Sequence, residues 1–119
     1  MADSMAGFPG FTGIGDARYI LRPEAIESVF ILYRMTGDER LRDQAWDMFQ
    51  AIERHTKVEY GSAALVDVTS NTPRQSDIME SFWTAETLKY FYLIFSPQDL
   101  ISLDDYVFNT EAHPFKRPV

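Results

Sequence analysis

The sequence predicts an all-α fold with one short strand near its C-terminus, and three observations carry this prediction. Two segments, about 23–35 and 39–55, repeat apolar residues with the period of an α-helix, and only a tight turn at Gly37 joins them. A third segment, about 76–95, is apolar almost all round in its second half. The β-forming run 106–108 supplies the strand. Because a helix that is apolar all round needs neighbours on several sides, we expect this unit to be incomplete.

The composition suits a single globular domain. The 119 residues are 45% hydrophobic and 14% aromatic, which is enough to build a core. The formal net charge is −7, from 18 acidic and 11 basic residues, and this balance argues against nucleic acid or an anionic membrane surface as the partner. The chain has no cysteine, so disulfides and thiolate metal sites are excluded.

The N-terminal segment, residues 1–15, is predicted to be a flexible tail. It contains four glycines and one proline, no basic residue, and no apolar run of the length found in a signal peptide. No stretch of the chain approaches the roughly 20 apolar residues that span a bilayer. Residues 16–119 show no repeat and no linker, so they are predicted to form one unit, and we expect a front end that would carry a targeting signal to be missing.

The first predicted helix begins at Pro23, which fits a first helical turn. Glu24 and Glu27 are neighbours on a second face at its N-terminus, where acidic residues complement the helix dipole, and spacing alone favours that structural explanation. Gly37 is expected to end this helix and Asp38 to cap the next one. The apolar face comprises Ile26, Val29, Phe30 and Tyr33.

Beyond the second helix, a short extended segment is predicted within residues 58–68 and a loop over residues 69–75. Ser76 or Asp77 is expected to cap the third helix, and Ser96-Pro97 to end it.

A polar cluster follows the C-terminal strand. Thr110 offers a hydroxyl and a carbonyl oxygen side by side, and Glu111 adds a carboxylate. These are the hard oxygen ligands that calcium prefers, although a capped strand end has much the same composition. The residue types therefore leave both a metal or ligand site and a simple strand end open.

Three strings in the sequence resemble one family. RYILRPEAIES at 18–28, MESFWTAETLKY at 79–90 and FNTEAHP at 108–114 are similar, in that order, to signatures of class I α-1,2-mannosidases, glycoside hydrolase family 47. The resemblance runs from about Asp16 to Pro114. It implies an incomplete (α/α)7 barrel, in which helical hairpins ring a cavity and a C-terminal β-hairpin plugs one end.

The resemblance also implies a set of site residues. Glu24 corresponds to a catalytic carboxylate that acts as general base on water, and Arg22 to a residue that contacts the sugar. Thr110 corresponds to a direct ligand of a Ca²⁺ ion, through its hydroxyl and its carbonyl. Phe82 and Glu86 lie four residues apart and are expected to share one helix face. The implied substrate-binding residues are Arg22, Phe82 and Glu86, and the implied carboxylates that act on calcium through water are Glu27, Glu86 and Glu111.

The family's general acid comes from helices upstream of the string at 18–28, and no residue before Asp16 matches it. We therefore expect the parent activity to be calcium-dependent, inverting removal of terminal α-1,2-linked mannose from high-mannose N-glycans, in the membranes of the endoplasmic reticulum or Golgi. We expect this chain to be a fragment that is inactive without the remaining barrel helices. A non-catalytic calcium- or mannose-binding remnant is the main alternative, and a helical interaction domain with an accidental resemblance is the third.

Overall fold

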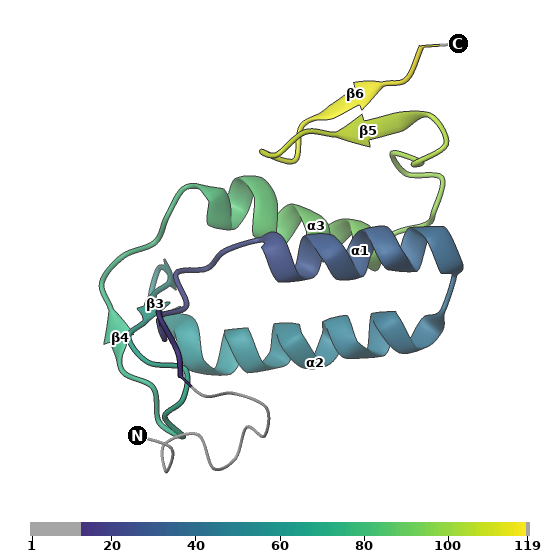
Figure 1. The fold of residues 1–119 in the computed structure, drawn as a ribbon. Coiled ribbons are helices and arrows are strands. Elements are labelled where there is room, and N and C mark those ends of the chain that lie inside the picture. Colours follow the sequence, from purple (N-terminus) through teal and green to yellow (C-terminus); the bar gives the residue numbers. More distant parts are fainter. Residues whose placement is uncertain (1–12, 119) are drawn as a thin grey trace.

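The computed structural model describes residues 13–118, so most of the predicted tail over residues 1–15 lies outside the described residues. Two long helices, α1 (Glu24–Thr36) and α2 (Glu39–Thr56), lie antiparallel, and a third helical segment packs beside α1. The C-terminal hairpin covers the side of α1 that faces away from α2 (Figure 1). The short strands between α2 and the third helical segment lie near the first described residues, at the end of the helices away from the turn that joins α1 to α2 (Figure 1).

The predicted α-hairpin is confirmed, with its turn built as expected. Gly37 adopts φ 69°, a left-handed conformation that suits glycine, and its N–H donates to the carbonyl of Tyr33 at 2.7 Å. The side chain of Asp38 accepts from the N–H of Arg40 at 3.0 Å and so caps α2. These two adjacent caps fix the direction in which α2 returns along α1.

The segment after α2 contains more strand pairing than the sequence indicated. Strands β1 (Lys57–Val58) and β2 (Gly61–Ser62) form one antiparallel pair, and β3 (Ala64–Leu65) and β4 (Gln75–Ser76) form another. The chain before α1 also pairs with this segment, through an antiparallel bridge between Tyr19 and Leu65. This bridge ties the chain entering α1 to the loop-rich end of the molecule.

The prediction that the third helix starts at Ser76 or Asp77 is wrong. Ser76 belongs to β4, and the carbonyl of Ile78 accepts from the N–H of Ala64 at 2.9 Å, so these backbone groups pair with β3 and its neighbours. Helical structure begins only at Phe82. Tertiary pairing has overridden the local capping signal.

The first turn of this helix is a π turn, Trp83–Thr87, followed by α3 (Leu88–Ile94). The N–H of Leu88 donates to the carbonyl of Trp83, five residues earlier. π turns within helices are rare and occur frequently at functional sites. The wider turn means that Phe82 and Glu86 are not stacked as an α-helical i, i+4 pair would be.

The hairpin of β5 (Tyr106–Phe108) and β6 (Pro114–Lys116) packs against the helices through one aromatic cluster. The ring centroid of Phe30 lies 5.4 Å from that of Tyr90 and 5.8 Å from that of Phe108, and Tyr90 and Phe108 are also 5.8 Å apart. Each such pair contributes about 0.5–1.5 kcal/mol beyond its buried area. The cluster therefore joins α1, α3 and the hairpin into one layer.

Arg34 on α1 holds the loop that leads from α3 to the hairpin. Its guanidinium stacks over the ring of Phe30, 4.9 Å from the centroid. Its nitrogens lie 2.8–3.4 Å from the carbonyl oxygens of Leu93, Pro97, Gln98, Leu100 and Ile101. The Arg34 guanidinium thus donates hydrogen bonds to carbonyl oxygens that have no helical partner at the end of α3, and it fixes the path of the chain toward β5.

Within residues 13–118, each helix is too short or too polar to cross a lipid bilayer.

Candidate functional site

A buried hydrogen bond positions the start of α1. The hydroxyl of Thr87 donates to the carbonyl of Leu21 at 2.7 Å, and both residues are almost fully buried. Leu21 has φ 68°, an unusual backbone conformation for a branched residue that this contact helps to hold. Pro23 then occupies the N-cap position of α1. The chain therefore turns sharply just before Glu24. The contact with the third helical segment fixes the point at which α1 starts, and with it the position of the Glu24 carboxylate.

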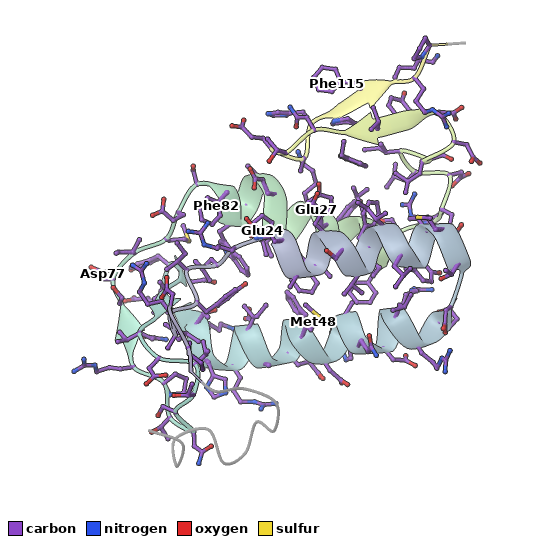
Figure 2. All side chains as sticks on the ribbon, in the orientation of Figure 1. Glu24, Glu27, Met48, Asp77, Phe82 and Phe115 are labelled. Atoms are coloured by element: carbon purple, nitrogen blue, oxygen red, sulfur yellow. The ribbon has the colours of Figure 1, made fainter. Side chains whose placement is uncertain are left out.

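Three carboxylates share one electrostatic environment on the hairpin side of the helices. Burial raises the pKa of Glu27 above its ordinary value, and the negative charges of Glu24 and Glu86 raise it further. Burial also raises the pKa of Tyr90 to about 12, with additional contributions from Glu27 and Glu86. Figure 2 shows Glu24 and Glu27 on the first turns of α1 and Phe82 at the start of the third helical segment. Mutually repelling carboxylates in this arrangement favour a cation.

The turn between β5 and β6 presents Thr110 and Glu111. The side-chain oxygen of Asn109 accepts from the N–H groups of Glu111 and His113, at 3.0 and 2.9 Å. Ala112 is buried with φ 60°, and its carbonyl accepts from the Nζ of Lys89 on α3 at 3.0 Å. The turn is thus held internally by Asn109 and from α3 by Lys89. Lys89 follows Glu86 by three residues in the sequence.

The oxygens of Thr110 fit a calcium ion. Thr110 is exposed, and within residues 13–118 neither its hydroxyl nor its carbonyl accepts a hydrogen bond, so both oxygens are available to a ligand. In the same range, no group of three or more His, Cys, Asp or Glu side chains is placed to hold a metal directly. The two oxygens of Thr110 are hard donors of the kind that calcium takes as ligands.

The other predicted site residues are placed differently. Phe82 is half-buried and directly precedes the π turn. Arg22 lines an apolar cavity of about 340 Å³ on the α2 side of α1, together with Ile26 and Met48. Glu111 is exposed, and its carboxylate lies 3.7 Å from His113 Nε2. The structure thus brings Glu24, Glu27 and Glu86 together and ties the turn that carries Thr110 to Lys89, whereas Arg22 lines another concavity.

Sequence reasoning missed several supporting residues. Asn109 carried a usable signal, because asparagine side chains often accept from N–H groups two residues on. Thr87, Lys89 and Tyr90 carried no such local signal. The hydrogen-bond partner of Thr87 lies 66 residues away in sequence, and that of Lys89 lies 23 residues away.

The helices and the carboxylate-rich side define a helical unit with a candidate polar site. A family model described as Glycosyl hydrolase family 47 matches residues 8–117, and the chain therefore belongs to this family. It is 52% identical over 103 residues to the mannosyl-oligosaccharide 1,2-alpha-mannosidase MNS1 of Arabidopsis thaliana, covering 87% of this chain and 18% of that protein. It is also 52% identical over 96 residues to the mannosyl-oligosaccharide 1,2-alpha-mannosidase IB of Homo sapiens, covering 81% of this chain and 15% of that protein.

The structure also superimposes on a solved relative. The alpha-1,2-mannosidase from Trichoderma reesei matches 96% of this chain with a TM-score of 0.85 and 43% identity, over 25% of its own length. The predicted fold class is confirmed, because the described chain corresponds to part of an (α/α)7 barrel with a C-terminal hairpin. The chain spans less than a fifth of the length of the two curated relatives it matches.

Proposed function

We propose that this chain is the C-terminal part of the catalytic domain of an α-1,2-mannosidase that trims terminal mannose from high-mannose N-glycans with inversion and with Ca²⁺. The proximity of Glu24, Glu27 and Glu86, together with the tie between Lys89 and the turn that carries Thr110, supports this proposal. The relatives named above are mannosyl-oligosaccharide mannosidases, which supports a glycan substrate. By family resemblance, the site of action is the endoplasmic reticulum or Golgi.

In the proposed mechanism, Glu24 acts as general base. Its carboxylate takes a proton from a water molecule, whose oxygen attacks the anomeric carbon as the bond to the leaving sugar oxygen breaks. A carboxylic acid on the opposite side, supplied by the remaining barrel, protonates that leaving oxygen. Inversion requires about 6.5–9.5 Å between the two carboxyl groups, which leaves room for the water.

The calcium ion would supply a charged oxygen-binding centre that fixes sugar hydroxyls. Thr110 would hold it through its two free oxygens, while Glu27, Glu86 and Glu111 would orient bound water. Phe82 would pack against the sugar ring, and Arg22 would contact the sugar when the rest of the barrel closes the site.

Exposed apolar surface supports the need for that remaining barrel. Trp46, Tyr92 and Phe95 are 49%, 68% and 37% exposed, and they border an apolar concavity of about 460 Å³ on α2 and α3. Contiguous apolar surface of this kind marks an interaction site. In the proposed parent enzyme, further barrel helices cover it.

A second candidate function is calcium or mannose binding without hydrolysis. It is favoured by the fact that all the proposed calcium-binding residues, and the general base, lie within these 119 residues. Calcium-dependent mannose binding by the monodisperse chain would support this function over that of an inactive fragment.

Hydrolysis is tested by incubating the purified 119-residue chain with a mannose-α-1,2-mannose disaccharide and calcium, then measuring free mannose. We expect no release above the rate of the Glu24→Gln variant, because the family resemblance places the general acid on helices upstream of the string at 18–28. Release that is abolished by Glu24→Gln would overturn the proposed inactivity of the chain alone.

Calcium binding is tested by isothermal titration calorimetry of the same chain. We expect Thr110→Ala to lower calcium affinity by at least about tenfold, equivalent to about 1.4 kcal/mol. Removal of calcium with a chelator should lower the unfolding midpoint of the wild-type chain, because binding to the folded state stabilises it. The exposed loop variant Thr72→Ala is the matched control and should change neither quantity. Equal affinities of wild type and Thr110→Ala would refute the assignment of Thr110.

A further inference from the structure

Tyr90 is a buried residue with a polar atom that the fold does not use. Its side chain is 1% exposed, and within residues 13–118 its hydroxyl has no hydrogen-bond partner. A buried hydroxyl without a partner costs about 1–3 kcal/mol, so phenylalanine would serve packing alone at least as well. The hydroxyl is therefore unexplained by the aromatic cluster that surrounds the ring.

The position of Tyr90 relates it to two of the site carboxylates. Tyr90 follows Glu86 by four residues on the same helical segment. Its ring packs 5.4 Å from that of Phe30, which follows Glu27 by three residues on α1. The phenol consequently stands between the two helices that carry these carboxylates, and the charges of Glu27 and Glu86 both act on it.

We propose that the Tyr90 hydroxyl is a positioning donor for the Glu27 and Glu86 carboxylates: when calcium is bound, it donates to them through one water and fixes their orientation toward Thr110. This inference rests on the proposed calcium-dependent function. A water that bridges two polar groups holds them nearly as well as a direct hydrogen bond does. Tyr90 touches neither the sugar nor the ion in this role and acts only through the carboxylates.

The test compares Tyr90→Phe with Tyr92→Phe in the 119-residue chain. Tyr92 is two residues away on α3 and 68% exposed, so the control removes the same hydroxyl at a solvated position. Calcium affinity is measured by calorimetry, and thermal unfolding is measured without calcium. We expect Tyr90→Phe to lower calcium affinity about tenfold while its calcium-free unfolding midpoint stays unchanged or rises. Tyr92→Phe should leave both unchanged.

A spectroscopic readout separates positioning from packing. Calcium binding should change the near-ultraviolet tyrosine absorbance of the wild type and of Tyr92→Phe, and this change should vanish in Tyr90→Phe. If the wild type binds calcium and Tyr90→Phe binds it equally well, the role of Tyr90 is refuted while the proposed function stands. If the wild type binds no calcium, the calcium part of the proposed function fails and this inference falls with it.

Discussion

The apolar face of α1 is packed in contrasting ways toward the hairpin and toward α2. On the hairpin side, the rings of Phe30, Tyr90 and Phe108 lie within 5.4–5.8 Å of one another, next to the carboxylates of Glu27 and Glu86. On the α2 side, Ile26 and its neighbours border an apolar cavity of about 340 Å³, and Figure 2 places Met48 of α2 toward α1 there.

This difference indicates that the chain is packed most rigidly beside the site carboxylates. Aromatic rings have few rotatable bonds, so a cluster of them supports neighbouring charged groups with little freedom to shift. A site whose carboxylates repel each other needs such support, because repulsion favours any alternative arrangement. The cavity on the α2 side lies away from these carboxylates, so looser packing there has less effect on them.

The largest effect is expected from removing the centre of the aromatic cluster. Phe30 is fully buried, so Phe30→Ala should lower the free energy of unfolding by about 3–5 kcal/mol through the cavity it creates. Met48→Ala, at a half-buried position beside the existing cavity, should cost only about 1–2 kcal/mol. Chemical denaturation of both variants checks this order, and an equal or reversed order would contradict the contrast between the two sides.

A smaller effect is expected from the contact that positions Glu24. Thr87→Val keeps the side-chain shape and removes the hydroxyl that donates to the Leu21 carbonyl, which should lower the free energy of unfolding by about 1–3 kcal/mol. Thr84 is exposed on the same π turn, so Thr84→Val is the matched control and should change stability by less than about 0.5 kcal/mol. Equal stability of the two variants in denaturation curves would show that the buried hydrogen bond contributes nothing.

The smallest effect on stability is expected at Glu27, and its sign depends on pH. Because the folded pKa of Glu27 is raised, the folded state binds more protons than the unfolded state between the two pKa values. Wild-type stability without calcium should therefore fall as the pH rises from the ordinary glutamate pKa through the raised one, and Glu27→Gln should lack this component.

Above that window Glu27→Gln should be at least as stable as wild type without calcium, yet bind calcium more weakly. Calcium-free stability is checked by unfolding measurements between roughly pH 4 and 8, where a raised glutamate pKa changes stability. Calcium affinity is checked by calorimetry. The exposed Glu59→Gln is the control. A variant with the wild-type pH dependence would show that Glu27 is not perturbed.

The sequence was informative where interactions are local. The caps at Gly37 and Asp38, the strand formed by the β-forming residues 106–108 and the helical period of α1 and α2 depend on residues close in sequence, and the structure confirms them. The start of the third helix was predicted wrongly, because Ser76 and Ile78 pair with strand residues that lie about a dozen positions earlier. The assignments of Glu24 and Thr110 depended on family resemblance and stay predictions, although the structure brings their neighbourhoods to one side.

The π turn at Trp83–Thr87 makes the length of this segment matter as much as its composition. A π turn holds one more residue than the α turn it replaces, so it is equivalent to a single-residue insertion in an otherwise regular helix. Converting the turn to regular α-helix with all its residues kept would rotate everything before it, Phe82 included, by about 100° around the helix axis relative to Tyr90, whereas deleting one residue would restore the regular helix with Phe82 pointing as before. The direction in which Phe82 points therefore depends on the π turn absorbing its extra residue.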